Sequence, residues 1–313
     1  MQRRKIIRAV ASITMAVSII SAGYILIDSI KSNKLNENLS EIHSYILKEV
    51  DSEPPNNKQN ISINVYPQIE AEPEEIINED ASPDTCEEEI CKEKIEMSKA
   101  TAALYSYNSD TIGWITVPGT KINYPVVQST DNEFYLHNDF NKEESQPGTI
   151  FADYRASVKE YGKHSGVITL YGHNQYDGAM FGQLDRYHNN LDFYKENPVF
   201  SFSDLYQTYE YKIVSVFVCK TTDSKLYPGE TVFDYQNYIN FNNDDYSREK
   251  FVENILNYSE IETTVDIQDN DEFVLLSTCS YVYQNARFVV VGRRVRENES
   301  NIVDVDAATS KLK

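Results

Sequence analysis

FVLLSTCSYVYQNARFVVVGRR, residues 273–294, is the stretch that the rest of the chain is expected to hold in place. Two short runs rich in Val, Leu and Phe flank a polar segment, so we expect two strands joined as a hairpin. Cys279 ends the first strand and Arg287 begins the second, which places a thiol beside a guanidinium at one rim of a sheet. A nearby Arg favours the thiolate and can stabilise an oxyanion. The pair still lacks a base.

Several other short apolar or alternating runs precede this hairpin. Each is bounded by Gly, Pro, Asn or Asp, as strands between turns are. Many short strands of this kind predict a mainly β fold, with the sheet closed into a barrel or folded as a sandwich. The runs are GWITVPG (113–119), NYPVVQ (123–128), GTIFAD (148–153), SGVITLYG (165–172), PVFSFS (198–203) and QTYEYKIVSVFVC (207–219).

Three helices are expected around this sheet. Residues 91–108 predict a helix at the start of the compact domain, which we place at residues 91–296. Residues 180–196 and 247–258 predict two more, the second with one apolar stripe. The last residues, 297–313, read as a polar tail.

Length and composition exclude several classes of protein. A chain of 313 residues with 41% apolar residues has room for one good-sized domain and additional segments. The net charge of −20 argues against binding nucleic acid through phosphate neutralisation. Four cysteines, at positions 86, 91, 219 and 279, are too few for a disulfide scaffold and match no usual zinc spacing. The acidic loop FNNDDY (241–246) lacks an EF-hand-like pattern, so no metal and no cofactor is expected.

The amino terminus predicts a membrane anchor within residues 1–30. Four basic residues among the first eight precede an uncharged run at residues 9–27, which is long enough to span about 30 Å of hydrocarbon as a helix. The basic flank predicts a cytoplasmic amino terminus, with the remaining chain extracellular. A cleaved signal peptide is the alternative, but this run is longer than a typical signal-peptide core.

Residues 31–90 are expected to connect the anchor to the domain. Residues 35–50 have a loose helical pattern, as expected of a stalk helix leaving the membrane. Residues 51–89 are rich in Pro, Asn, Asp and Glu without a sustained period, which is typical of an extended spacer. Cys86 and Cys91 at its end are expected to be incidental thiols or one local disulfide.

Sequence context separates the two remaining cysteines. Cys219 ends a run that is apolar at nearly every position, so we expect a buried structural thiol that lies away from the reacting groups. Cys279 follows Ser277 and Thr278 and precedes a polar turn, which favours it as the nucleophile. The two hydroxyls beside it are candidates for substrate binding, with solvated or packing roles as the alternative.

Five histidines are candidates for the base. His43 falls in the stalk and His188 in a predicted helix, where surface or packing roles are usual. His137 and His164 lie in predicted loops. His173 follows the predicted strand SGVITLYG, at a strand end of the kind where catalytic groups commonly lie. A Cys and a His in one chain are the general pattern of a cysteine transferase or peptidase.

These motifs together resemble the class B sortases. The resemblance rests on YGHN at residues 171–174, LSTC at residues 276–279, an Arg eight residues beyond that Cys, and the amino-terminal anchor. It extends over about residues 91–296, and the helical insert before the last hairpin favours class B. The sortase pattern has Thr where this chain has Leu275, which we interpret as a mild variation on the strand.

The resemblance implies a closed, sortase-like β-barrel with peripheral helices and a membrane-anchored cysteine transpeptidase of Gram-positive cell surfaces. Cys279 would cleave a carboxy-terminal sorting motif of a secreted protein after its Thr, and an amine of peptidoglycan would then accept the acyl group. His173 would be the general acid and base, and Arg287 would stabilise the oxyanion. A membrane-anchored peptidase that uses water, or a non-catalytic surface binding module, remains open at this point.

Overall fold

The computed structural model describes residues 97–221, 226, 232–241 and 244–311, together with residues 27, 30–32, 34–41 and 44. The predicted membrane-spanning run lies outside these residues except for Ile27, as do His43, Cys86 and Cys91. Among the described residues, no helix combines the length and the apolar character that a membrane span requires.

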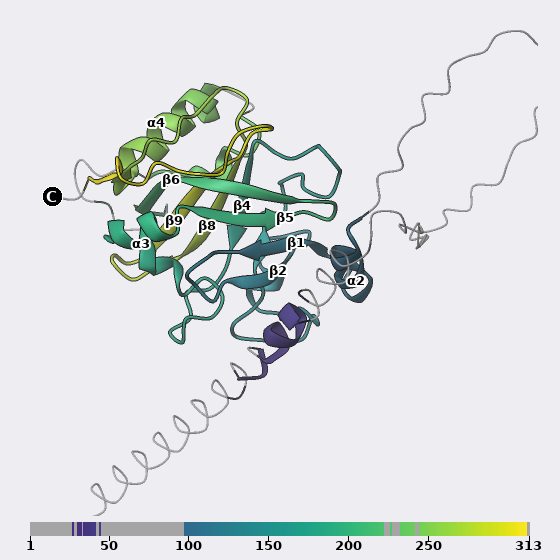
Figure 1. The fold of residues 1–313 in the computed structure, drawn as a ribbon. Helices are drawn as coiled ribbons and strands as arrows, with labels where there is room; N and C mark the ends of the chain where they lie inside the picture. Colours follow the sequence, from purple (N-terminus) through teal and green to yellow (C-terminus); the bar gives the residue numbers. More distant parts are fainter. Residues whose placement is uncertain are drawn as a thin grey trace, which may run out of the picture.

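Eight strands close into a β-barrel in the order β1-β2-β3-β4-β8-β9-β6-β5, which confirms the predicted mainly β fold (Figure 1). Most neighbouring strands are antiparallel, but β2 and β3 are parallel, and so are β4 and β8. Parallel neighbours end at the same rim, so β4 and β8 deliver their last residues together. The strands are β1 (Thr111–Thr116), β2 (Asn123–Val127), β3 (Phe151–Ala152), β4 (Val167–Tyr171), β5 (Val199–Ser203), β6 (Thr208–Lys220), β8 (Phe273–Ser280) and β9 (Ala286–Arg294).

The predicted hairpin is formed by β8 and β9. Their register runs from Phe273 opposite Arg293 to Ser280 opposite Ala286, with a turn at residues 281–285. Asn285 in this turn has φ +54°, a left-handed conformation that Asn tolerates better than most residues. The hairpin therefore closes next to its last pair of facing residues.

Both strands of the hairpin are apolar because both of their faces are covered. Leu276 and Val290 belong to a core cluster with members from strands around the barrel. Leu275 and Val289 point the other way, into a second cluster that includes Phe251 of the helix outside the barrel. Strands buried on both sides have nearly continuous apolar sequences, as this pair does.

The helices agree with the predictions in part. The predicted helix at residues 247–258 is confirmed as α4 (Arg248–Tyr258), and residues 97–107 contribute α2 (Lys99–Tyr107). The single helix predicted over residues 180–196 is wrong. That segment contains the short turn η2 (Leu184–Tyr187) and then α3 (Leu191–Glu196), with Asn190 capping the second by accepting from Phe193 N at 3.0 Å. The remaining short turns are η1 (Phe134–Leu136), η3 (Tyr235–Asn237) and η4 (Asp244–Tyr246).

The helix before the acidic segment lies against the barrel. Its described residues, between 27 and 44, are drawn in purple in Figure 1. Leu39 is buried in a cluster with Leu104 of α2 and Trp114 of β1, and Ser40 Oγ accepts from Asn123 Nδ2 of β2 at 2.5 Å. The chain therefore contacts the barrel both before and after the acidic segment, and the barrel is a partner for the helix that the sequence pattern left open.

The carboxy-terminal residues also return to the domain. β10 (Thr309–Ser310) pairs with β7 (Ile261–Glu262) in a separate two-stranded sheet. Glu299 forms an ion pair with the fully buried Arg293 of β9, and this pairing holds the pKa of the Glu299 carboxyl far below its usual range. The polar residues predicted as a tail thus contribute contacts that stabilise the hairpin.

Candidate active site

The ends of β4 and β8 bring His173 and Cys279 to one rim of the barrel. Tyr171 pairs with Ser277 in parallel, and the backbone N–H of Gly172 donates to Ser277 O at 3.2 Å. His173 follows Tyr171 by two residues, and Cys279 follows Ser277 by two residues. Because the two segments run in the same direction from a paired position, His173 and Cys279 are adjacent.

Arg287 reaches Cys279 from the other side. It faces Cys279 directly in the antiparallel register of β8 and β9. Facing residues of antiparallel strands point to the same side of a sheet, with Cβ atoms about 4.5–5.5 Å apart. Cys279, His173 and Arg287 are each partly exposed. The three predicted residues therefore lie at one solvent-accessible rim, with the thiol in the middle.

The orientation of His173 is set by a backbone carbonyl. Its Nε2 lies 2.9 Å from the carbonyl oxygen of Leu136, which can only accept a hydrogen bond. Nε2 therefore carries the proton, and in the neutral ring Nδ1 keeps its lone pair. Hydrogen bonding of one ring nitrogen in this way leaves the other available for proton transfer.

Asn174 links the histidine segment to the cysteine strand. Its Nδ2 donates to the carbonyl oxygen of Cys279 at 2.9 Å and to Asp185 Oδ2 at 2.8 Å. Asn174 was not among the predicted site residues, although it is the last residue of the YGHN motif. Its place in that motif, directly after the candidate base, was the only signal.

Cys219 is buried, as predicted, but its expected location was wrong. It faces Arg287 from β6, across β9 from Cys279, because the antiparallel register of β6 and β9 brings the end of β6 to the same rim. Burial raises the pKa of its thiol to about 12, although the Arg287 charge acts in the opposite direction. Strands two positions apart are separated by about 9.5 Å, which exceeds the roughly 7 Å between Cα atoms that a disulfide allows.

Ser277 and Thr278, the predicted substrate-binding hydroxyls, are both buried. Ser277 Oγ lies 2.7 Å from the hydroxyl of Tyr235, and Thr278 Oγ1 donates to Gly172 O at 2.8 Å. Tyr235 belongs to η3, in the insert that covers the outer face of the sheet. Each hydroxyl thus joins β8 to a neighbouring segment.

Comparison with known proteins identifies the family of this chain. The family model of the sortase domain matches residues 115–295, which is more than half of the chain. The chain belongs to the sortase family. It is 32% identical over 198 residues to sortase B of Listeria monocytogenes serovar 1/2a, covering 61% of this chain and 72% of that protein. It is also 32% identical over 196 residues to sortase B of Staphylococcus aureus strain NCTC 8325, covering 62% of this chain and 74% of that protein.

A solved structure of a Staphylococcus aureus sortase B–substrate complex has the same fold. It aligns with a TM-score of 0.62 at 23% identity and covers 86% of this chain and 99% of that chain. Together with the relatives in sequence, it confirms the resemblance to class B sortases. This sortase is accordingly a cysteine transpeptidase by family.

The position where this sortase departs from the family pattern lies in the core. Leu275 is fully buried, pairs with Thr169 of β4 and Val291 of β9, and belongs to the outer apolar cluster. Its strand position is four residues before Cys279. An apolar side chain fits these surroundings, so the substitution is a packing change in β8.

Two other described histidines, His164 and His188, have carboxylate partners away from the rim. His164 is buried and lies 3.0 Å from Asp204 Oδ2, and the pair holds the pKa of Asp204 below its usual range despite burial. His188 Nδ1 lies 2.8 Å from Glu260 Oε1. His137 is exposed and directly follows Leu136, whose carbonyl oxygen accepts from His173. In the part of the chain that the structure describes, no group of three His, Cys, Asp or Glu side chains is arranged to hold a metal ion.

Proposed function

We propose that this sortase cleaves a carboxy-terminal sorting motif of a secreted protein after its Thr and transfers the acyl group to a peptidoglycan amine. Cys279 is the nucleophile, His173 the general acid and base, and Arg287 the group that stabilises the oxyanion. One observation carries the proposal: Cys279 ends the central strand of three whose flanking strands lead to His173 on one side and Arg287 on the other.

The first half of the reaction forms a thioester. Nδ1 of His173 takes the proton of the Cys279 thiol as the sulfur attacks the scissile carbonyl carbon. The carbonyl oxygen becomes an oxyanion beside the Arg287 guanidinium, whose fixed donors favour that charge. The C–N bond then breaks, and His173 donates a proton to the leaving amine. Acyl transfer is thus divided into two easier steps.

The second half releases the enzyme. An incoming amine attacks the thioester carbonyl, and His173 accepts a proton from it. The C–S bond breaks, a new amide bond forms, and His173 passes the proton to the departing sulfur, which restores the thiol of Cys279. Because water could attack the same thioester, the identity of the acceptor separates a transpeptidase from a peptidase.

A membrane location completes the proposal. The uncharged run at residues 9–27 would anchor the chain with its amino terminus in the cytoplasm and the barrel outside. The described helix that follows contacts the barrel through Leu39 and Ser40. A barrel held close to the anchor would meet secreted proteins as they leave the membrane.

Product analysis tests the function. Full-length protein in detergent is incubated with a peptide containing a sorting motif and with triglycine as the amine acceptor. We expect a ligated product by mass spectrometry, and none with Cys279→Ala. Hydrolysis alone with every acceptor tried would contradict the transferase. Unchanged binding of surface proteins by Cys279→Ala, with no turnover by the unmodified enzyme, would favour a binding module.

A further inference from the structure

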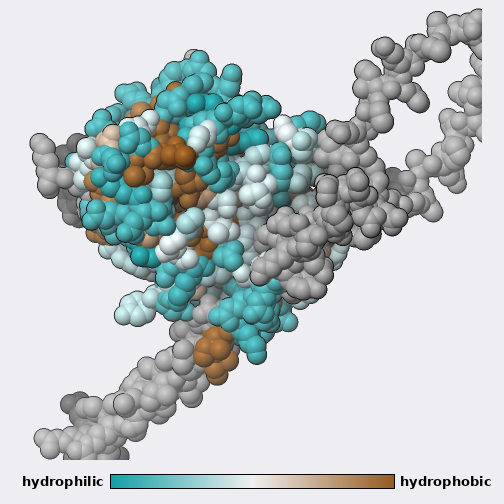
Figure 2. All heavy atoms as spheres, viewed as in Figure 1, coloured by the Kyte–Doolittle hydropathy of each residue, from teal (hydrophilic) through white to brown (hydrophobic). Residues whose placement is uncertain are grey.

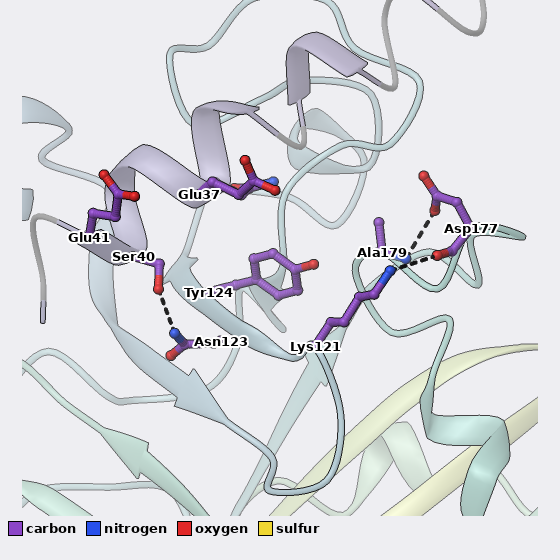
Figure 3. A pocket seen from close by; sticks show the side chains of 9 residues that line it. Glu37, Ser40, Glu41, Lys121, Asn123, Tyr124, Asp177 and Ala179 are labelled. Atoms are coloured by element: carbon purple, nitrogen blue, oxygen red, sulfur yellow. Dashed lines mark hydrogen bonds between the residues drawn. The ribbon is translucent and has the colours of Figure 1, made fainter.

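A cavity of about 650 Å³ lies beside the proposed active site, between the amino-terminal helix and the barrel (Figure 3). The helix contributes Glu37, Ser40 and Glu41, β2 contributes Tyr124, and the segment after His173 contributes Asp177. The outward surface of the helix is largely hydrophilic in Figure 2. The cavity is therefore open, polar and formed by parts of the chain that are far apart in sequence.

Negative charge dominates the lining of this cavity. Glu37 and Glu41 stand four residues apart on the helix, so they lie on one face of it. Asp177 lies across the cavity from them, and among the described residues of the lining Lys121 is the single cationic one. Lys121 Nζ donates to the backbone oxygen of Asp177 at 3.4 Å. Within the described residues, neither Glu37 nor Glu41 forms an ion pair, so the cavity has an excess of negative charge.

An aromatic ring lies between these carboxylates. Figure 3 shows the ring of Tyr124 between Glu37 on one side and the Lys121 and Asp177 region on the other. Burial raises the pKa of the Tyr124 hydroxyl, and the charges of Asp177 and Glu37 raise it further, so both carboxylates act on this residue. A ring face and nearby carboxylates are the groups that recognise an ammonium ion.

The cavity is connected to the reacting groups by one short hairpin. Asn174 forms a bridge with Met180, and Phe181 N donates to His173 O at 3.0 Å, which closes the hairpin at its base. Its base contacts the Cys279 backbone through Asn174, and its tip carries Asp177 into the cavity. Two residues separate Asn174 from Asp177, so the Cα atoms of these two residues are at most about 11 Å apart.

We propose that this cavity binds an ammonium group of the amine acceptor while a second amine of the same acceptor attacks the thioester. The acceptor is then a peptide with two amino groups, one that reacts and one that Glu37, Glu41 and Tyr124 hold. This inference rests on the proposed transferase function and adds an acceptor class and a site to it.

The test compares two acceptors that differ by one charge. Gly-Gly-Lys-amide and its Nε-acetyl derivative are supplied to the full-length enzyme with a saturating sorting peptide, and the ligated products are sequenced by mass spectrometry. We expect an acceptor KM about tenfold lower for the charged peptide, since one held ammonium group gives roughly that factor. Glu37→Gln with Glu41→Gln should abolish this preference.

A matched variant controls for the loss of two charges. Glu253 on α4 and Glu262 on β7 are exposed acids outside the cavity, so Glu253→Gln with Glu262→Gln should keep the tenfold preference. Equal KM values for the two acceptors in the unmodified enzyme, or a preference that survives the Glu37 and Glu41 changes, would overturn the inference.

Failure of the proposed function gives a different result. In that case no ligated product forms with either acceptor. The inference is then tested by binding alone, with calorimetric titration of the two peptides into the unmodified enzyme and the two double variants. Tighter binding of the charged peptide, lost only in the Glu37 and Glu41 variant, supports the cavity as an ammonium site. Equal heats for both peptides reject it.

Discussion

Two thiols flank the same arginine in this sortase, and they have opposite properties. Cys279 faces Arg287 from β8 and is partly exposed, whereas Cys219 faces it from β6 and is buried. The difference comes from what covers each strand end. Aromatic residues of the insert, such as Tyr235, cover Cys219, and the segment with His173 lies beside Cys279. Proximity to a cation is therefore insufficient, because a nucleophile also needs access and a base.

The largest effect should separate the two thiols completely. Cys279→Ala removes the proposed attacking sulfur, so we expect the rate of peptide transfer to fall by about 10⁴-fold or more. Cys219→Ala leaves the three reacting groups in place. The measurement is ligated product per enzyme over time for both variants. Comparable losses in both would mean that the two thiols share the reaction, contrary to the geometry.

The shared arginine provides the second test. Arg287→Ala removes the proposed oxyanion donor, and we expect kcat for transfer to fall about 10²–10³-fold. Arg287→Lys keeps the charge but loses the planar arrangement of donors, so it should restore only part of the rate. Steady-state kinetics with the sorting peptide measure both. Full activity of the Lys variant would show that charge alone is required.

Asn174 tests whether the base is positioned through the cysteine strand. Asn174→Ala removes the hydrogen bonds to Cys279 O and Asp185, and we expect kcat to fall about tenfold, as other positioning partners do. The pH dependence of kcat should also change, because His173 would be held less firmly. Asn189→Ala is a suitable control, since this Asn lies in the turn before α3. A loss in stability with an unchanged pH profile would indicate a structural role only.

How much the sequence could predict depends on the range of the interactions. The hairpin was predictable because its strand pattern is local, and the same short motifs were enough to select Cys279, His173 and Arg287 as candidates. The position of Cys219 was not, because it depends on the register of β6 against β9. The break in the predicted helix at residues 180–196 follows from local caps at Asn190 that compete with a moderate helical pattern.

The amino-terminal helix shows the same limit at longer range. Its pattern at residues 35–50 predicted a helix, yet nothing local indicated that Leu39 packs against α2 and β1. The cavity exists only because of that packing. Tyr235 is a similar case, since its contact with Ser277 joins residues 42 positions apart in the chain.

The smallest effect concerns the reactivity of Cys219. In the folded protein burial raises the pKa of this thiol to about 12, whereas an exposed thiol titrates near 8.5. Iodoacetamide at pH 8, followed by peptide mapping, should modify Cys279 and leave Cys219 unmodified until the protein unfolds. Because the folded state holds the Cys219 thiol in its protonated form, protonation of this thiol stabilises the folded protein. This stabilisation is complete below the pKa of the thiol in the unfolded chain and is lost as the pH rises toward 12.

Cys219→Ala should therefore retain transfer activity within about twofold, because only a small buried side chain is removed and the free energy of unfolding falls by ~1 kcal/mol. The variant should also lose less stability than the unmodified enzyme between about pH 9 and pH 12, as measured by urea unfolding at each pH, since it lacks the thiol that ionises on unfolding. Parallel losses in both proteins would assign the alkaline sensitivity to the buried tyrosines. Rapid modification of Cys219 at pH 8 in folded enzyme would remove the distinction between the two thiols.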